Sequence, residues 1–242
     1  MILARFIYPD INMAITFAKK QFPKETILMS VRWYVSYKLS YRDIEELNAE
    51  RGVSVDHATL HRWVLEYAPQ LEAEFRKRKR PVSGSWRMDE TYMKVKGEWQ
   101  YLYRAVDKHG DTIDFMLSKN RDEPAARKFF QKAINQHGLP EKVVIDKSGS
   151  NTAALDTINC QIFCAGMVLC FIEVIHSKYL NNIVEQSHRP TKWKMRTALG
   201  FKSVEGAEAT IAGVELWQML RNGQMKETGD MTLWEQFYSL AA

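Results

Sequence analysis

The stretch RMDETYMKVKGEWQYLYRAVDKHG, residues 87–110, decides the fold, because its apolar residues alternate with polar ones. Alternation with a period of two is typical of β-strands that bury one face. Lys96-Gly97 stands where a tight turn would join two such strands, and TIDFMLS at 112–118 continues the alternation. The pattern predicts three consecutive antiparallel strands, at 86–95, 98–106 and 112–118.

The chain beyond the third strand alternates between helix and strand. Apolar residues recur at helical spacing over Asp122–His137, and KVVID at 142–146 is a short apolar strand that ends at Asp146. Further helices are predicted at 151–158, from Asn181 or Asn182 through Glu185, and at 203–220, with a strand inside 162–175. Three antiparallel strands, a helix, a strand and further helices is the element order of a ribonuclease-H-like α/β domain, a mixed sheet flanked by helices.

The first 80 residues have helical periodicity instead. Pro23 and the Ser40/Asp43 pair resemble helix starts, and a third helix is predicted from about Val55. The polar face of this third helix carries His57, Thr59, His61 and Arg62. Two short helices joined by a turn with Gly52 match a DNA-reading helix-turn-helix, although a plain three-helix bundle would show the same stripes. We therefore expect an all-α helix-turn-helix domain with a basic linker at 1–80 and the α/β domain at 81–242.

The composition fits a folded DNA-binding protein and excludes general disorder. Of 242 residues 45% are hydrophobic and 26% are charged, with a formal net charge of +5. Basic residues are concentrated in the unbroken block Arg76–Arg80 and in an acid-free group consisting of Arg189, Lys192, Lys194, Arg196 and Lys202. Both groups suit contacts with phosphates, and the alternative is a solvated linker and a solvated helix face.

Three acids lie where a carboxylate is costly unless it is paired. Asp89 is within a strand, Asp146 ends a buried strand, and Glu185 follows the apolar Ile183 and Val184. Each could be structural: an ion-pair partner of Arg87, a turn former and a helix-start acid, respectively. As a trio they suit phosphodiester chemistry, in which carboxylates hold two magnesium ions at one scissile phosphate.

Longer motifs carry a family resemblance. VRWYVSYKLSYRDIEEL at 31–47, RGVSVDHATLHRWVLEYAP at 51–69, the stretch 87–110, VVIDKSGSNTAAL at 143–155 and KYLNNIVEQSHR at 178–189 are similar to the DDE transposases of insertion sequence family six. The resemblance covers about Phe17 to Gln224 and leaves residues 1–12 outside it. It implies that Asp89, Asp146 and Glu185 are the catalytic, metal-binding residues, and that Lys192 contacts substrate phosphate.

The resemblance also implies a reaction and its partners. The protein is expected to bind the terminal inverted repeats of its element, to cleave DNA strands and to transfer 3′ ends to target DNA, with two magnesium or manganese ions. Double-stranded DNA and a homo-oligomer in the DNA complex are the expected partners. A catalytically inactive DNA-binding protein derived from a transposase is the alternative, and a nuclease without strand transfer is a more distant one.

One long helix is expected to present Glu185 and the DNA-contacting cations Arg189, Lys192 and Arg196 on a single face. Two features depart from the family pattern. Glu185 follows Asp146 by 185 − 146 = 39 positions, a longer spacing than usual, and Ser187 and Pro190 stand where acidic and helix-compatible residues are common. A proline inside a helix removes one backbone hydrogen bond and kinks it.

The cysteines and the apolar segments indicate a cytoplasmic protein, and the resemblance implies a bacterial one that is associated with the nucleoid when bound to DNA. Cys160, Cys164 and Cys170 lie within eleven positions, which matches neither a disulfide framework nor a common zinc site, so buried reduced thiols are expected. The apolar segment Cys160–Phe171 is expected to pack against the sheet or a partner subunit. No secretion signal or membrane span is predicted.

Overall fold

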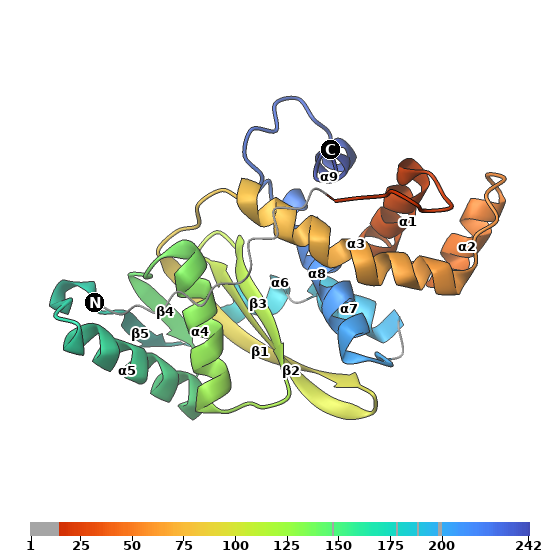
Figure 1. Cartoon of the computed structure of the whole chain (residues 1–242). Coiled ribbons are helices and arrows are strands. Elements are labelled where there is room, and N and C mark those ends of the chain that lie inside the picture. Colours follow the sequence, from red (N-terminus) through yellow and green to blue (C-terminus); the bar gives the residue numbers. More distant parts are fainter. Residues whose placement is uncertain (1–14, 147, 178, 188, 198–199) are drawn as a thin grey trace.

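The computed structural model describes residues 15–146, 148–177, 179–187, 189–197 and 200–242, which form one mixed sheet with helices on both faces (Figure 1). The strands are β1 (Ser85–Val95), β2 (Glu98–Asp107), β3 (Thr112–Ser118), β4 (Lys142–Ile145) and β5 (Glu173–His176). Their order in the sheet is β3-β2-β1-β4-β5, with β1, β2 and β3 antiparallel and β4 and β5 parallel to β1. The predicted three-strand meander and ribonuclease-H-like order are confirmed.

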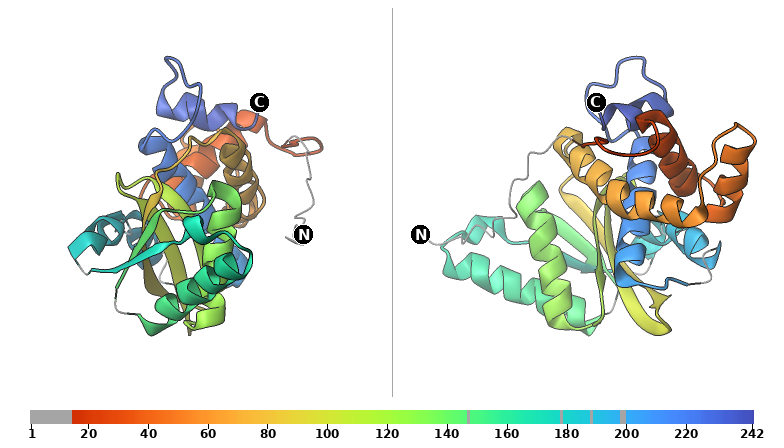
Figure 2. Two further views of the ribbon diagram at one scale, coloured as in Figure 1. Left: turned by 90° about the vertical axis from the view of Figure 1, so that its left-hand side faces the viewer. Right: turned by 45° about the vertical axis from the view of Figure 1, so that its right-hand side comes forward.

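The helices form two layers. They are α1 (Lys24–Ser36), α2 (Tyr41–Ala49), α3 (His57–Arg78), α4 (Glu123–His137), α5 (Gly149–Cys164), α6 (Asn182–Ser187), α7 (Arg189–Thr197), α8 (Val204–Arg221) and α9 (Leu233–Ser239), with 3-10 turns η1 (Val168–Cys170) and η2 (Tyr179–Asn181). Helices α4 and α5 cover one face of the sheet, and α8 with the end of α3 covers the other (Figure 2).

Apolar side chains of β1 point alternately to the two faces of the sheet and contribute to a hydrophobic core on each face. Trp86 and Met88 face α4 and α5, whereas Met93 and Val95 face the layer of α3 and α8. The β1–β2 turn at Lys96 and Gly97 has φ angles of 52° and 83°, the left-handed region in which glycine is favoured. The turn that the sequence predicted is therefore confirmed.

The helix starts in the N-terminal region also follow the predicted signals. Ser40 and Asp43 form a reciprocal capping box at α2, and the Asp56 side chain accepts hydrogen bonds from two backbone amides of α3. Helix α3 then runs on to pack against α8. At Gly213 of α8, a Cβ atom would lie 2.5 Å from Cγ1 of Val35 in α1, so only glycine permits this close helix contact.

One hydrophobic core therefore joins α1, α2 and α3 to α8, α9 and one face of the sheet, on both sides of residue 80. The predicted division at residue 80 remains a prediction about which part of the chain contacts DNA. The described residues contain no helix that is long and apolar enough to span a membrane.

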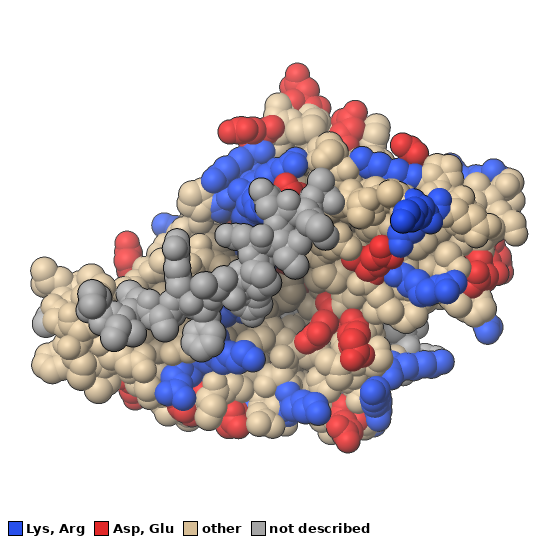
Figure 3. Space-filling model, viewed as in Figure 1, with Lys and Arg blue, Asp and Glu red and all other residues tan. Residues whose placement is uncertain are grey.

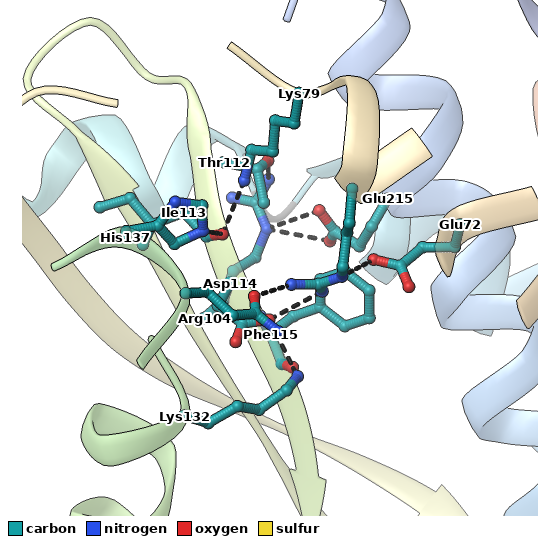
Figure 4. A network of polar contacts seen from close by, with 12 residues as sticks. Glu72, Lys79, Arg104, Thr112, Ile113, Asp114, Phe115, Lys132, His137 and Glu215 are labelled. Atoms are coloured by element: carbon teal, nitrogen blue, oxygen red, sulfur yellow. Dashed lines mark hydrogen bonds and ion pairs between the residues drawn. The ribbon is translucent and has the colours of Figure 1, made fainter. Parts of the chain in front are cut away.

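The basic block Arg76–Arg80 includes the last turn of α3, and two of its cations are not free for the predicted phosphate contacts. Arg76 contacts Glu72 and donates a 2.8 Å hydrogen bond to the fully buried carboxylate of Asp114. Lys79 is buried and donates to the carbonyl oxygen of Ile113 at 2.7 Å (Figure 4). These two cations hold the end of α3 on β3 and are unavailable to phosphates.

The cysteine prediction is also wrong in one respect. Cys160, Cys164 and Cys170 are free thiols, as expected, but all three are exposed. Between Ile162 and Ile172, which are buried, Leu169 is fully exposed and Phe163 is 59% exposed. Most of the segment 160–171 therefore does not pack against the sheet, because α5 carries it beyond the last turn that touches the core.

Candidate active site

Asp89 and Asp146 come to the same level of the sheet through the pairing of β1 with β4. The pairing is parallel and aligns Arg87 with Val144, so two residues further along Asp89 and Asp146 lie side by side. Strand β4 ends at Ile145, whereas β1 continues to Val95. The edge of β1 is therefore open where the two half-buried carboxylates meet.

Glu90 joins these two acids, which the sequence did not predict. Oxygen atoms of Asp89, Glu90 and Asp146 lie within 4.8 Å of one another. Neighbouring residues of a strand point to opposite faces, and this alternation argued against grouping Glu90 with Asp89. The Asp89 and Glu90 carboxylates can nevertheless approach each other, because β4 ends at Ile145 and no β4 residue lies beside β1 beyond that point. The adjacent acids in RMDETY were the available signal.

The Glu90 side chain is nearly buried and is held from two sides. Asn151 of α5 donates a 2.9 Å hydrogen bond to Oε1, and Arg121 lies 3.7 Å from Oε2. Burial raises the pKa of the Glu90 carboxyl, and Arg121 and Asn151 oppose that increase. The negative charges of Asp146 and Asp89 raise it further. The centre therefore concentrates negative charge that a bound cation would stabilise.

The helix that carries Glu185 lies beside this centre, although the Glu185 side chain is outside the described part of the structure. Asn181, just before α6, donates a hydrogen bond to the carbonyl oxygen of Met88 at 3.3 Å. Val184 is fully buried, and α6 packs against β1. The structure thus brings Asp89 and Asp146 together and places the backbone of Glu185 on an element next to Asp89.

The predicted single long helix after Glu185 stays a prediction. Helix is described over Asn182–Ser187 as α6 and over Arg189–Thr197 as α7, and residue 188 between them lies outside the described residues. The shared face of Glu185, Arg189, Lys192 and Arg196 therefore stays a prediction as well. Arg189 is exposed and Lys192 half-buried, and the side chain of Arg196 is outside the described residues.

Lys194, which the sequence grouped with the phosphate-binding cations, is buried. Its ammonium donates hydrogen bonds to the carbonyl oxygens of Tyr37 and Leu39, between α1 and α2. Burial lowers the pKa of Lys194 to about 7. This lysine holds α7 against the segment between α1 and α2 and does not face solvent.

The predicted DNA-reading residues differ in their availability at the start of α3. His57 and Arg62 are exposed, with His57 Nδ1 3.0 Å from Glu45. Thr59 is half-buried and donates to Asp56 while accepting a 2.7 Å hydrogen bond from Arg62. His61 is half-buried beside the Tyr41 hydroxyl, and burial lowers its pKa.

Charges of both signs are mixed on one side of the molecule. On the side shown in Figure 3, basic and acidic side chains are interspersed.

A further charged cluster is buried between the sheet and the helices. Arg104, which lies opposite Asp89 in the β1–β2 pairing, binds Glu215 of α8 at 2.9 Å (Figure 4). Glu215 also accepts a hydrogen bond from Thr191 of α7. This cluster fixes α7 and α8 behind the strand that carries Asp89.

Comparison with known proteins gives consistent matches. Residues 83–224 match a family described as the DDE domain. The transposase for insertion sequence-like element IS431mec of Staphylococcus aureus strain N315 is 42% identical over 199 residues, which cover 82% of this chain and 85% of that protein. The transposase for IS257 in transposon Tn4003, also from Staphylococcus aureus, is 41% identical over the same shares. Among solved structures, the catalytic core domain of HTLV-2 integrase in complex with magnesium aligns with 66% of this chain and 99% of its own, at 20% identity and a TM-score of 0.41.

Proposed function

Because the chain belongs to the DDE transposases of insertion sequence family six, we propose that it binds the terminal inverted repeats of its element, cleaves DNA strands and transfers their 3′ ends to target DNA. The observation that carries this proposal is the meeting of the Asp89 and Asp146 carboxylates at the open edge of β1. Both residues lie just beyond the point where the pairing of β1 with β4 ends. The rigid sheet therefore holds the two carboxylates in fixed positions.

The donor set fits divalent magnesium or manganese. Carboxylate oxygens are the ligands that hard divalent cations prefer, and three such groups approach within 4.8 Å. Asp89, Asp146 and Glu185 would hold two ions, which when bound would activate the attacking oxygen and stabilise the leaving one. Glu90, held by Asn151 and Arg121, would support the centre from the opposite face of β1.

The remaining predicted residues would hold DNA. Arg189, Lys192 and Arg196 on α7 would contact phosphates near the acids, and His57, Thr59, His61 and Arg62 would contact the repeat through α3. Of these, the exposed Arg62 is best placed for base contact. Joining of two element ends requires two active sites, so we expect a homo-oligomer on DNA, acting at the bacterial nucleoid.

A cleavage assay tests the proposal. The full chain is incubated with duplex DNA that carries the terminal repeat and its flank, with magnesium or manganese. Wild type should nick the strand at the repeat boundary and join the 3′ end to a target duplex. Asp89→Asn, Asp146→Asn and Glu185→Gln should each reduce cleavage at least about a thousandfold and retain repeat binding. Asp156→Asn, an exposed acid on α5, is the matched control.

Two outcomes would contradict the proposal. Specific binding by wild type without divalent-ion-dependent cleavage would identify the inactive DNA-binding protein. Cleavage without joining would identify a nuclease. Normal cleavage by any one of the three acid variants would remove that residue from the catalytic set.

A further inference from the structure

A cleft of about 870 Å³ lies between the helix-turn-helix and the end of the β1–β2 hairpin. Most of its lining comes from three places: the starts of α2 and α3, the hairpin from Lys94 to Gly97, and residues 200–210 at the start of α8. Tyr34 of α1 and Lys194 of α7 complete the wall. His57, Ala58 and His61 of α3 form part of its wall. The cleft therefore begins at the helix end that we propose reads the repeat and continues to a strand of the α/β region.

Exposed cations from all three places line this cleft: Arg42, Lys94, Lys96 and Lys202. Among the described residues that line it there is no aspartate or glutamate. The ion pairs between described residues also leave these four side chains out. Four unneutralised cations along one cleft create a positive potential that would attract a polyanion.

Backbone pairing fixes three of these cations relative to one another. Phe201 donates to the carbonyl oxygen of Lys94 at 3.2 Å and accepts a hydrogen bond from the amide of Lys96 at 2.8 Å. Residues 200–202 thus form an additional edge along the hairpin, and Lys202 is held next to Lys94 and Lys96. The backbone that carries these three cations is therefore rigid, and a ligand could bind them without a rearrangement of the backbone.

We propose that this cleft binds the sugar-phosphate backbone of the terminal-repeat DNA next to the base pairs that α3 reads. The β1–β2 hairpin, the extension of the strand that carries Asp89, would then be a second DNA contact. The inference rests on the proposed function. A backbone fits better than a small anion, because the cations lie at the exposed rim on separate segments, whereas the buried Lys194 at the cleft wall is already bound to backbone carbonyls.

The salt dependence of binding tests this proposal in the full chain. The variant combines Lys94→Gln, Lys96→Gln and Lys202→Gln. The control combines Lys108→Gln, Lys128→Gln and Lys226→Gln, three exposed lysines outside the cleft, and has the same net charge. In a plot of log affinity for repeat DNA against log salt, each lost phosphate contact should reduce the slope by about one. The cleft variant should lose about two to three units of slope, and the control should keep the wild-type slope.

Neutral methylphosphonate linkages locate the contact. In wild type, one linkage placed at successive phosphates should weaken binding at two or three adjacent positions beside the α3 footprint. These penalties should disappear in the cleft variant, because the partner charges are gone, and should persist in the control. Equal slopes and equal penalties for the cleft variant and the control would overturn the cleft assignment, even where wild type binds and cleaves the repeat. Failure of wild type to bind the repeat would instead contradict the proposed function.

A small anionic ligand is the competing outcome. Inorganic triphosphate that binds wild type but not the cleft variant at micromolar concentration, with unchanged DNA affinity of that variant, would assign the cleft to a free phosphate compound and overturn the DNA proposal. Circular dichroism and thermal unfolding should match among the three proteins, since all of the replaced side chains are exposed.

Discussion

Lys194 of α7 donates a 2.8 Å hydrogen bond to the carbonyl oxygen of Leu39, in the turn between α1 and α2. The same ammonium lies 3.7 Å from the centre of the Tyr34 ring, a cation–π contact. Helix α7 directly follows α6, the helix of Glu185. One side chain thus links the N-terminal helices α1 and α2 to the segment next to the candidate active site.

Loss of this link should loosen α7. In Lys194→Met the two carbonyl oxygens lose their donor, and each such bond contributes about 1 kcal/mol. We expect backbone amides of α7 to exchange with deuterium about thirtyfold faster, with α3 exchange unchanged. Mass spectrometry of the exchanged peptides measures this. Lys226→Met, an exposed lysine far from α7 in sequence, is the control, and equal α7 exchange in the two variants would contradict the link.

Stability should rise as the pH increases from about 7 to about 10, because of the buried lysines. Burial, with the nearby charge of Arg76, lowers the pKa of Lys79 to about 7 in the folded protein, whereas the unfolded chain keeps its proton to about 10.4. Between these values the unfolded state binds more protons, so the free energy of unfolding increases with pH. Urea titrations of Lys79→Met should show a smaller increase than wild type. Lys128→Met, exposed on α4, should keep it.

The sequence predicted the elements with strong local signals and missed features that depend on tertiary packing. The β1–β3 meander follows from alternation, and α2 and α3 begin at their capping residues, which are local interactions. The exposure of the segment 160–171 did not follow from its composition, since its apolar residues favoured burial. Whether an apolar segment is covered depends on the elements that pack over it, and here Ile162 and Ile172 reach the core whereas Leu169 does not.

The acidic site was predictable only in part. The positions of Asp89 and Asp146 on adjacent parallel strands follow from the element order. The proximity of Glu90 does not, because it requires that β4 end just where β1 continues. Arg76 and Lys79 were expected to contact phosphates for a related reason: a run of basic residues looks solvated until a buried carboxylate, here Asp114, lies beside it.

Asp114→Asn should strongly destabilise the fold. The carboxylate is fully buried between Arg76 and Lys132, at 2.8 and 2.9 Å. Burial alone would raise the pKa of Asp114, but these two cations outweigh it and hold the pKa below its usual range. Removal of the charge leaves two cations without their shared partner, a loss of about 3–5 kcal/mol. Urea unfolding measures it. Asp111→Asn, on a partly exposed contact with Arg80, should cost less than about 1 kcal/mol, and equal losses would contradict the role of Asp114.

All three cysteines should react in the native protein. Cys160, Cys164 and Cys170 are exposed free thiols, so a chromogenic disulfide reagent should modify three thiols per chain without denaturant. The rate should increase less than about twofold in urea if exposure is already complete. Replacement of all three by serine should leave the melting temperature within about 2 °C of wild type, since little apolar area is lost. Fewer than three thiols reacting before unfolding would contradict the exposed placement of this segment.

A matched pair of substitutions separates the exposed and buried parts of the segment 160–171. Leu169 is fully exposed, so Leu169→Asp removes no buried contact and should change the free energy of unfolding by less than about 0.5 kcal/mol. Ile162, in the last turns of α5, is 7% exposed and packs in the core between the sheet and the layer of α4 and α5. Ile162→Asp would therefore bury an unpaired carboxylate. We expect Ile162→Asp to lose more than about 3 kcal/mol or to fail to fold. Urea unfolding and size-exclusion chromatography of both variants measure the difference. Unfolding or aggregation of Leu169→Asp would show instead that this side chain is covered in solution, as the sequence alone predicted.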